Sequence, residues 1–212
     1  MADFVTLTKP FSAPRQQRDA DFMGMYVFLA TETMLFGGLL VLIYAYRVAH
    51  PEASFTAARH LKLWIATANT GLLLTSSLAV ALAVLFARHG RRRLVGAALL
   101  IALMLGLGFL GLKSWEYWQD FEGGLAPGIG PASPLRSQPA ALFINLYFVA
   151  TGLHAVHLII GLGALIWTST AVLRRKVRIP NQAIVVEMTG LYWHFVDVVW
   201  VFVFPIFYLA RG

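Results

Sequence analysis

The sequence contains no cysteine among its 212 residues. This absence excludes disulfides, cysteine-bound zinc and iron–sulfur sites, and any copper site that requires a thiolate ligand. Charged residues are also scarce, at 13% of the chain, whereas soluble globular proteins carry about 25%. Because 58% of the residues are hydrophobic, the composition indicates an integral membrane protein rather than a soluble domain.

Five apolar stretches are long enough to cross a hydrocarbon layer of about 30 Å at about 1.5 Å per helical residue. They cover residues 22–47, 62–87, 94–118, 140–172 and 182–210. The segments between them hold prolines, glycines and runs of arginine, all of which are unfavourable in lipid. We therefore predict an all-α integral membrane protein with a cytoplasmic N-terminal tail over residues 1–21. A single domain of five transmembrane helices follows over residues 22–212.

Basic residues are divided unequally between the two ends of this predicted bundle. One end has eleven, namely Lys9, Arg15, Arg18, Arg88, Arg91, Arg92, Arg93, Arg174, Arg175, Lys176 and Arg178. The other end has five, namely Arg47, Arg59, Lys62, Arg136 and Arg211, and Lys113 lies inside the third span. The positive-inside rule then places the N-terminus in the cytoplasm and the C-terminus in the periplasm. The net charge of +7 thus reflects membrane orientation, and we expect no nucleic-acid partner.

The segment Gly106-Leu107-Gly108-Phe109-Leu110-Gly111 has the glycine spacing of a dinucleotide-binding loop. Such a loop requires a preceding strand and the start of a helix, whereas this segment lies inside an apolar span. We expect its small residues to let neighbouring helices approach closely instead.

Ionisable side chains inside the predicted spans each cost about 3 kcal/mol to insert, so each requires a partner, a cavity or a task. Glu32 lies near the middle of the first span, and nothing on its own helix neutralises it. Glu116 lies near the outer end of the third span, where we expect it to reach water. The remaining candidates follow helical spacing along the last two spans and are His154, His157, Glu187, His194 and Asp197.

Three interpretations of these polar residues remain open on the sequence alone. In the first, they form hydrogen bonds between helices or anchor lipid head groups. In the second, His154 or His157 together with His194 ligates a haem b. In the third, the buried carboxylates and histidines form a proton or ion path, although the repeated halves and broken helices of many transporters are not visible.

The segment Tyr192-Trp193-His194-Phe195-Val196-Asp197-Val198-Val199-Trp200 resembles the signature of subunit III of the haem–copper oxidases, the cytochrome c oxidase subunit 3 family. Three further segments agree in the same order. They are Thr31-Glu32-Thr33-Met34-Leu35-Phe36, Trp115-Glu116-Tyr117, and Thr151-Gly152-Leu153-His154-Ala155-Val156-His157. The resemblance extends from about residue 22 to the end of the chain.

This resemblance implies a non-catalytic subunit with no haem or copper of its own, these cofactors being expected in the partner subunits. The implied partners are the catalytic subunit I and subunit II of a proton-translocating oxidase in a bacterial plasma membrane, together with phospholipids. The chain would stabilise the catalytic subunit, bind lipid and support proton and oxygen access.

The resemblance also implies roles for the candidate residues. Glu32 matches the family's buried membrane carboxylate, and a lipid cleft is expected between the first two spans. Contacts with lipid or between helices are implied for His154, His157, Glu187, His194 and Asp197. Arg174 and Arg175 are expected to meet lipid phosphates.

The sequence departs from the mitochondrial pattern in three ways. It shows five spans rather than seven, and Gln182 and Ala183 stand where a histidine pair often precedes the family glutamate. The loop over residues 121–139, a linker or a cap, is rich in Gly and Pro. This loop and the segment Phe204-Pro205-Ile206-Phe207-Tyr208-Leu209 resemble accessory proteins of nitric oxide reductases. An accessory subunit of a quinol oxidase or nitric oxide reductase therefore remains an alternative, as does a stand-alone haem b membrane anchor.

Overall fold

The computed structural model describes residues 14–124 and 138–209, and within these ranges it contains no β-strand. Its five long helices are α1 (Pro14–Ala49), α3 (Leu63–Arg88), α4 (Arg92–Glu122), α5 (Gln138–Leu173) and α6 (Ile184–Tyr208). Each is long and apolar enough to cross a membrane. The predicted all-α fold with five membrane-spanning helices is therefore confirmed, while the orientation of the termini stays a prediction.

Two helical segments differ from the sequence-based expectation. Helix α1 begins at Pro14 rather than at residue 22, so part of the predicted tail is helical. A short additional helix, α2 (Pro51–His60), follows α1. Pro51 at its first position and Glu52 in its first turn both favour a helix start. The other observed bounds lie within four residues of the predicted ones. Most of the expected cap, residues 125–137, lies outside the described residues.

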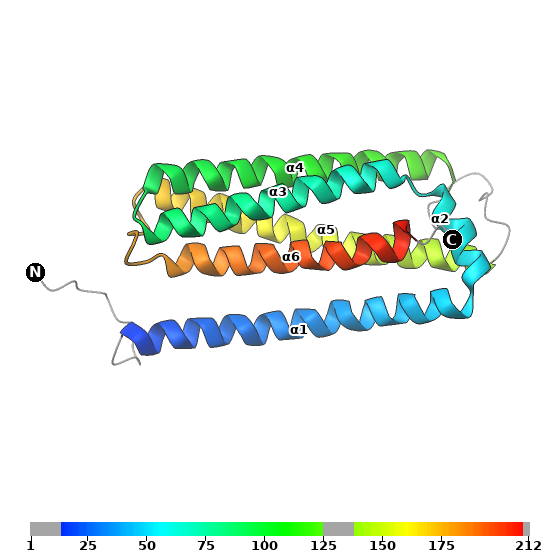
Figure 1. The fold of residues 1–212 in the computed structure, drawn as a ribbon, viewed down its shortest axis with the longest axis horizontal. Helices are drawn as coiled ribbons and strands as arrows, with labels where there is room; N and C mark the ends of the chain where they lie inside the picture. The colour runs from blue at the N-terminus through cyan, green and yellow to red at the C-terminus, as the bar shows by residue number, and fades with distance from the viewer. Residues whose placement is uncertain (1–13, 125–137, 210–212) are drawn as a thin grey trace, which may run out of the picture.

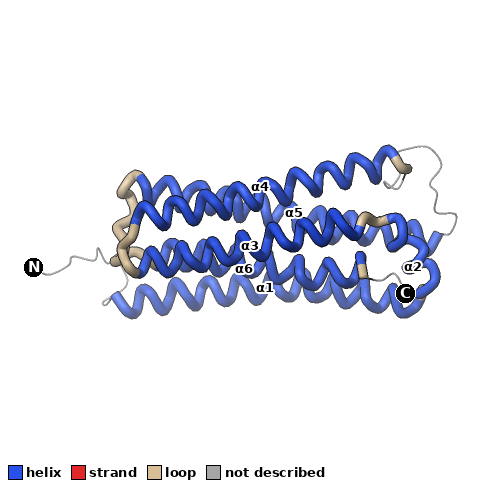
Figure 2. The backbone as a smooth tube through the Cα atoms, turned by 45° about the horizontal axis from the view of Figure 1, so that its top comes forward, coloured by secondary structure: helices blue, strands red, loops and turns tan. Residues whose placement is uncertain are grey.

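The five long helices run along one common axis (Figure 1). Helices α3, α4, α5 and α6 pack together, and α1 lies along one side of them beside α6 (Figure 2). Only 11% of the most apolar stretch of α1 is buried within the chain, against 50% for α6. Most of the surface of α1 is therefore left for lipid or for another subunit.

Small residues allow close contact among α4, α5 and α6. A Cβ atom on Gly106 would lie 2.8 Å from the ring of Trp193 and 2.8 Å from Leu162, and one on Gly161 would lie 3.0 Å from the same ring. The indole N–H of Trp193 then donates to Ser76 Oγ of α3 at 3.1 Å. The expected packing role is thus confirmed at Gly106, whereas Gly111 of the same segment faces open space.

Candidate functional site

Glu32 of α1 pairs with His157 of α5. Glu32 Oε2 lies 3.0 Å from His157 Nε2, and the other ring nitrogen, Nδ1, lies 2.9 Å from the Leu153 carbonyl oxygen. Both ring nitrogens thus face an oxygen, so both contacts are hydrogen bonds only if the two side chains share one acidic proton. With that proton the pair carries no net charge, whether imidazolium faces carboxylate or neutral imidazole faces carboxylic acid. That neutrality removes the electrostatic cost that isolated Glu32 would have in a membrane.

Glu116 lies at the centre of a buried cluster near the end of the bundle where α4 and α6 terminate. Its carboxylate is fully buried and lies 3.0 Å from Lys113 Nζ. The hydroxyls of Tyr208 and Tyr147 donate to its second oxygen at 2.6 Å and 3.1 Å. The expectation that Glu116 reaches water is therefore wrong, because donors from α4, α5 and α6 enclose it.

Lys113 is held by the same hydroxyls and by aromatic rings. Its ammonium group donates to Tyr147 and Tyr208 at 2.8 Å each. It also lies 4.7–5.4 Å from the ring centroids of Tyr117, Tyr147, Trp200 and Tyr208. Such contacts stabilise a desolvated cation. Sequence reasoning did not foresee this cluster, although the spacing of Lys113 and Glu116, which favours an ion pair on one helix, was a usable signal.

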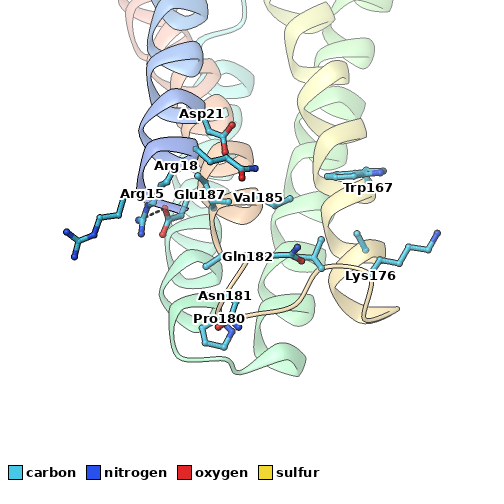
Figure 3. A pocket seen from close by; sticks show the side chains of 15 residues that line it. Arg15, Arg18, Asp21, Trp167, Lys176, Pro180, Asn181, Gln182, Val185 and Glu187 are labelled. Atoms are coloured by element: carbon cyan, nitrogen blue, oxygen red, sulfur yellow. Dashed lines mark hydrogen bonds and ion pairs between the residues drawn. The ribbon is translucent and has the colours of Figure 1, made fainter. Parts of the chain in front are cut away.

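Glu187 joins three helices at the opposite end of the bundle. Located in the first turn of α6, it accepts hydrogen bonds from Arg88 of α3 at 2.8 Å and from Arg18 of α1 at 3.2 Å. Figure 3 shows Arg18 reaching across from α1 to Glu187, with Trp167 of α5 on the far wall of a cavity of about 650 Å³. Gln182, at the position of the family histidine, also lines this cavity.

A second cavity, of about 490 Å³, lies between α1, α3 and α6. Its walls are mostly apolar and include Phe22, Tyr26, Val84 and Leu191, and Arg88 and Glu187 line its polar part. The first and second predicted spans thus border a hollow together with α6, while its occupancy by lipid stays a prediction.

The remaining candidates do not assemble into one site. His194 Nδ1 lies 2.6 Å from Ser77 Oγ of α3. His154 packs between Phe109 and Trp200, whose ring centroids lie 5.7 Å and 5.2 Å from its own. Neither ring nitrogen of His154 and neither carboxylate oxygen of Asp197 has a hydrogen-bond partner among the described residues. The polar stripe expected along the last span is therefore divided between different neighbours.

The surroundings of the histidines bear on whether these residues could hold a haem or a metal ion. Both ring nitrogens of His157 lie within hydrogen-bond distance of an oxygen, and the ring of His154 packs against Phe109 and Trp200. Among residues 14–124 and 138–209, no three acidic or histidine side chains converge in a way that could hold a metal ion. Glu32, His157, Glu187 and His194 instead join one helix to another, whereas His154 and Asp197 form no such hydrogen bond among the described residues.

Arg174 and Arg175 lie on the exposed connection between α5 and α6. Within the described part of the chain, neither side chain forms an ion pair. Both are therefore available to an external anion.

Five helices that are long and apolar enough to span a membrane, with several of their charged groups in buried or partly buried pairs, define a multi-pass helical membrane protein. Residues 17–211 match the family model described as cytochrome c oxidase subunit III. The chain therefore belongs to this family, and the family predicted from the sequence is confirmed.

Relatives agree with this assignment. The chain is 32% identical over 193 residues to cytochrome c oxidase subunit 3 of Alkalihalophilus pseudofirmus, covering 89% of this chain and 85% of that protein. It is 27% identical over 190 residues to the probable quinol oxidase subunit 3 of Staphylococcus haemolyticus, covering 88% and 87%. A probable quinol oxidase subunit 3 of Staphylococcus aureus is 27% identical over 205 residues, covering 95% and 94%.

Proposed function

We propose that this chain is the non-catalytic subunit III of a respiratory haem–copper terminal oxidase in a bacterial plasma membrane. The observation that carries the proposal is the family match over residues 17–211. The use of the buried charges in contacts between helices agrees with a role that is structural rather than redox. Haem and copper belong, in this proposal, to the partner subunits I and II.

The proposed task is to cover one flank of the catalytic subunit and to keep lipid ordered there, which supports its proton and oxygen routes. The exposed surface of α1 and the two cavities beside it support this task. Their apolar walls suit acyl chains, and Arg174 and Arg175 suit lipid phosphates. Glu32 and His157 serve as a neutral connection between α1 and α5.

The electron donor divides the proposal into two versions. A relative at 32% identity is named for cytochrome c oxidase, and relatives at 27% are named for quinol oxidase. We favour the cytochrome c oxidase type and retain the quinol oxidase as the second candidate.

The decisive experiment purifies the full chain from its native membrane in mild detergent and identifies what co-purifies. We expect a haem–copper catalytic subunit in stoichiometric amount and oxygen consumption with reduced cytochrome c. Activity with quinol alone would select the second candidate. A co-purifying nitric oxide reductase would overturn the oxygen reductase assignment. A haem b spectrum from the chain without other subunits, lost in His194→Ala, would instead establish the membrane anchor.

A further inference from the structure

We propose that four arginines at one end of the bundle form a binding site for the phosphate of an anionic phospholipid. Arg92, Arg93, Arg175 and Arg178, with Gly90, line a hollow of about 640 Å³. This inference deepens the lipid role within the proposed function, but it does not depend on which catalytic subunit the chain accompanies.

The hollow forms where two connections meet. The α3–α4 turn and the α5–α6 connection lie at the same end of the molecule (Figure 1). A Cβ atom on Gly90 would lie 3.5 Å from the ring of Pro180, so the two backbones approach closely. The first turn of α4 and the α5–α6 connection thereby bring two arginines each to one place.

The charge of this hollow is not balanced by the described chain. None of its lining residues is acidic, and none of its four guanidinium groups forms an ion pair within the described ranges. Glu187, a carboxylate at the same end, is already bound by Arg18 and Arg88. Like charges gathered without a counter-ion repel one another, so the cluster favours an external anion.

The start of α4 strengthens this preference. Helix N-termini favour negative charge, because their first N–H groups lack partners within the helix. The first turn of α4 contains no acidic residue and begins with Arg92 and Arg93 instead. The side chain of Arg91, at the N-cap position, forms no capping hydrogen bond. An anion bound here would therefore meet both the arginines and the positive end of the helix.

Arg175 occupies a position that ordinarily suits glycine. Lys176 N–H donates to the Ala171 carbonyl at 2.9 Å and Arg175 N–H to the Val172 carbonyl at 3.2 Å, which is the Schellman pattern that ends a helix. Arg175 takes the left-handed backbone position of this pattern, with φ of 60°. An arginine is thus present where glycine would fit with less strain, which agrees with a use for its charge.

The surroundings favour a lipid over a soluble phosphate. Leu94 follows Arg93 directly, Leu173 lies two residues before Arg175, and they are 40% and 46% exposed. Both lie in helices long and apolar enough to span a membrane, near the end where head groups would be. A charged rim above exposed apolar side chains matches the division of a phospholipid into phosphate and acyl chains.

The test measures phosphatidylglycerol retained by the purified complex that contains the full chain, after exchange into a phosphatidylcholine bilayer doped with phosphatidylglycerol. Replacing both Arg92 and Arg178 by Gln removes one arginine from the first turn of α4 and one from the α5–α6 connection. Each lost contact should lower retention by about fivefold. The matched control replaces Arg47 and Arg59, which lie toward the other end of the bundle and outside the lining, and should retain wild-type lipid. Equal losses in both double variants would overturn a defined site.

A second variant guards against misfolding. Arg175→Gly removes a charge while placing glycine at the positive φ it prefers, so retention should fall while the melting temperature stays level or rises. Undiminished retention would overturn the role of Arg175. Millimolar inorganic phosphate should leave the lipid bound, and its displacement by phosphate would overturn the lipid assignment in favour of a soluble ligand.

Discussion

At the scale of single residues, the Lys113–Glu116 pair shows how a membrane bundle holds opposite charges without water. Removing two charges from water is costly, and a buried pair offsets this cost only when its remaining hydrogen-bonding sites are filled. The hydroxyls of Tyr147 and Tyr208 fill them here. The cluster therefore depends on all four side chains being present.

We predict that Lys113→Met will lower the free energy of unfolding by about 3–5 kcal/mol, because Glu116 loses its counter-charge where no water reaches it. Thermal unfolding of the solubilised chain measures this effect. Removal of both charges in the Lys113→Met, Glu116→Gln double variant should restore much of the loss. Arg59→Met, at an exposed position, provides the control. Equal effects of both methionine variants would contradict the prediction.

We predict that Glu32→Ala will leave electron transfer nearly normal but will shorten the lifetime of the complex during turnover or reduce its bound lipid. The physical reason is that His157 then loses the carboxyl group that lies 3.0 Å from its Nε2 atom. His157→Ala should act similarly. In the double variant, the loss in free energy of unfolding should differ from the sum of the two single losses by about 0.5–3 kcal/mol. Glu52→Ala, exposed on α2, serves as the control. Unchanged lifetime together with unchanged lipid would count against this role.

Sequence reasoning located these residues but not their partners. The need of Glu32 for a partner follows from its depth in an apolar span, yet nothing local selects His157, which is 125 residues away. The position of Glu116 near the outer end of a span favours contact with water when the sequence is considered alone. Its burial depends on tyrosines from two other helices, and these contacts depend on helix rotation that local spacing does not define.

At the scale of helices, the positions of small residues determine how closely two helices can pack. Gly106 of α4 meets Trp193 of α6 and Leu162 of α5, whereas Gly111 of the same glycine segment faces open space. The identical residue type thus has two different roles within about one and a half helical turns.

We predict that Gly106→Ala will destabilise the bundle by about 1–3 kcal/mol, because the added methyl group overlaps with a buried indole ring. Gly111→Ala should be neutral or stabilising by up to about 1 kcal/mol, since it only lowers backbone entropy. Melting temperatures of the two solubilised variants test this pair directly. Comparable losses at both positions would refute the packing argument.

The long helices were predictable because each is defined by a continuous apolar run of membrane length. Helix α2 was not, because it is short and only partly apolar. Its Ser54, Ala57 and Ala58 are buried against the rest of the chain. Tertiary packing therefore contributes to this helix, and that contribution is absent from a local pattern.

At the scale of the whole molecule, charge is distributed by end. The α3–α4 turn, the α5–α6 connection and the start of α1 share one end, and α2 lies at the other (Figure 1). The arginine-rich segments therefore gather on one side of the bundle. The positive-inside rule predicts that this side faces the cytoplasm.

We predict that a cysteine at His89 will react with a membrane-impermeant maleimide only after cells are permeabilised, whereas one at Glu52 will react in intact cells. Both positions are exposed, and they lie at opposite ends of the bundle. His89 directly follows α3, and Glu52 lies in the first turn of α2. The natural chain contains no cysteine and gives no background labelling. The reverse pattern would invert the predicted orientation.

The packing of α1 also determines the order in which the molecule can be assembled during synthesis. Arg18 and Glu32 of α1 find their partners 169 and 125 residues later in the chain. A ribosome delivers α1 to the bilayer well before α5 and α6 exist, so α1 first resides there as a lone helix with an unpaired carboxyl group. Its docking is consequently a late step of biogenesis, and chains that end before α6 would leave Arg18 without Glu187 and α1 without much of the surface on which it rests.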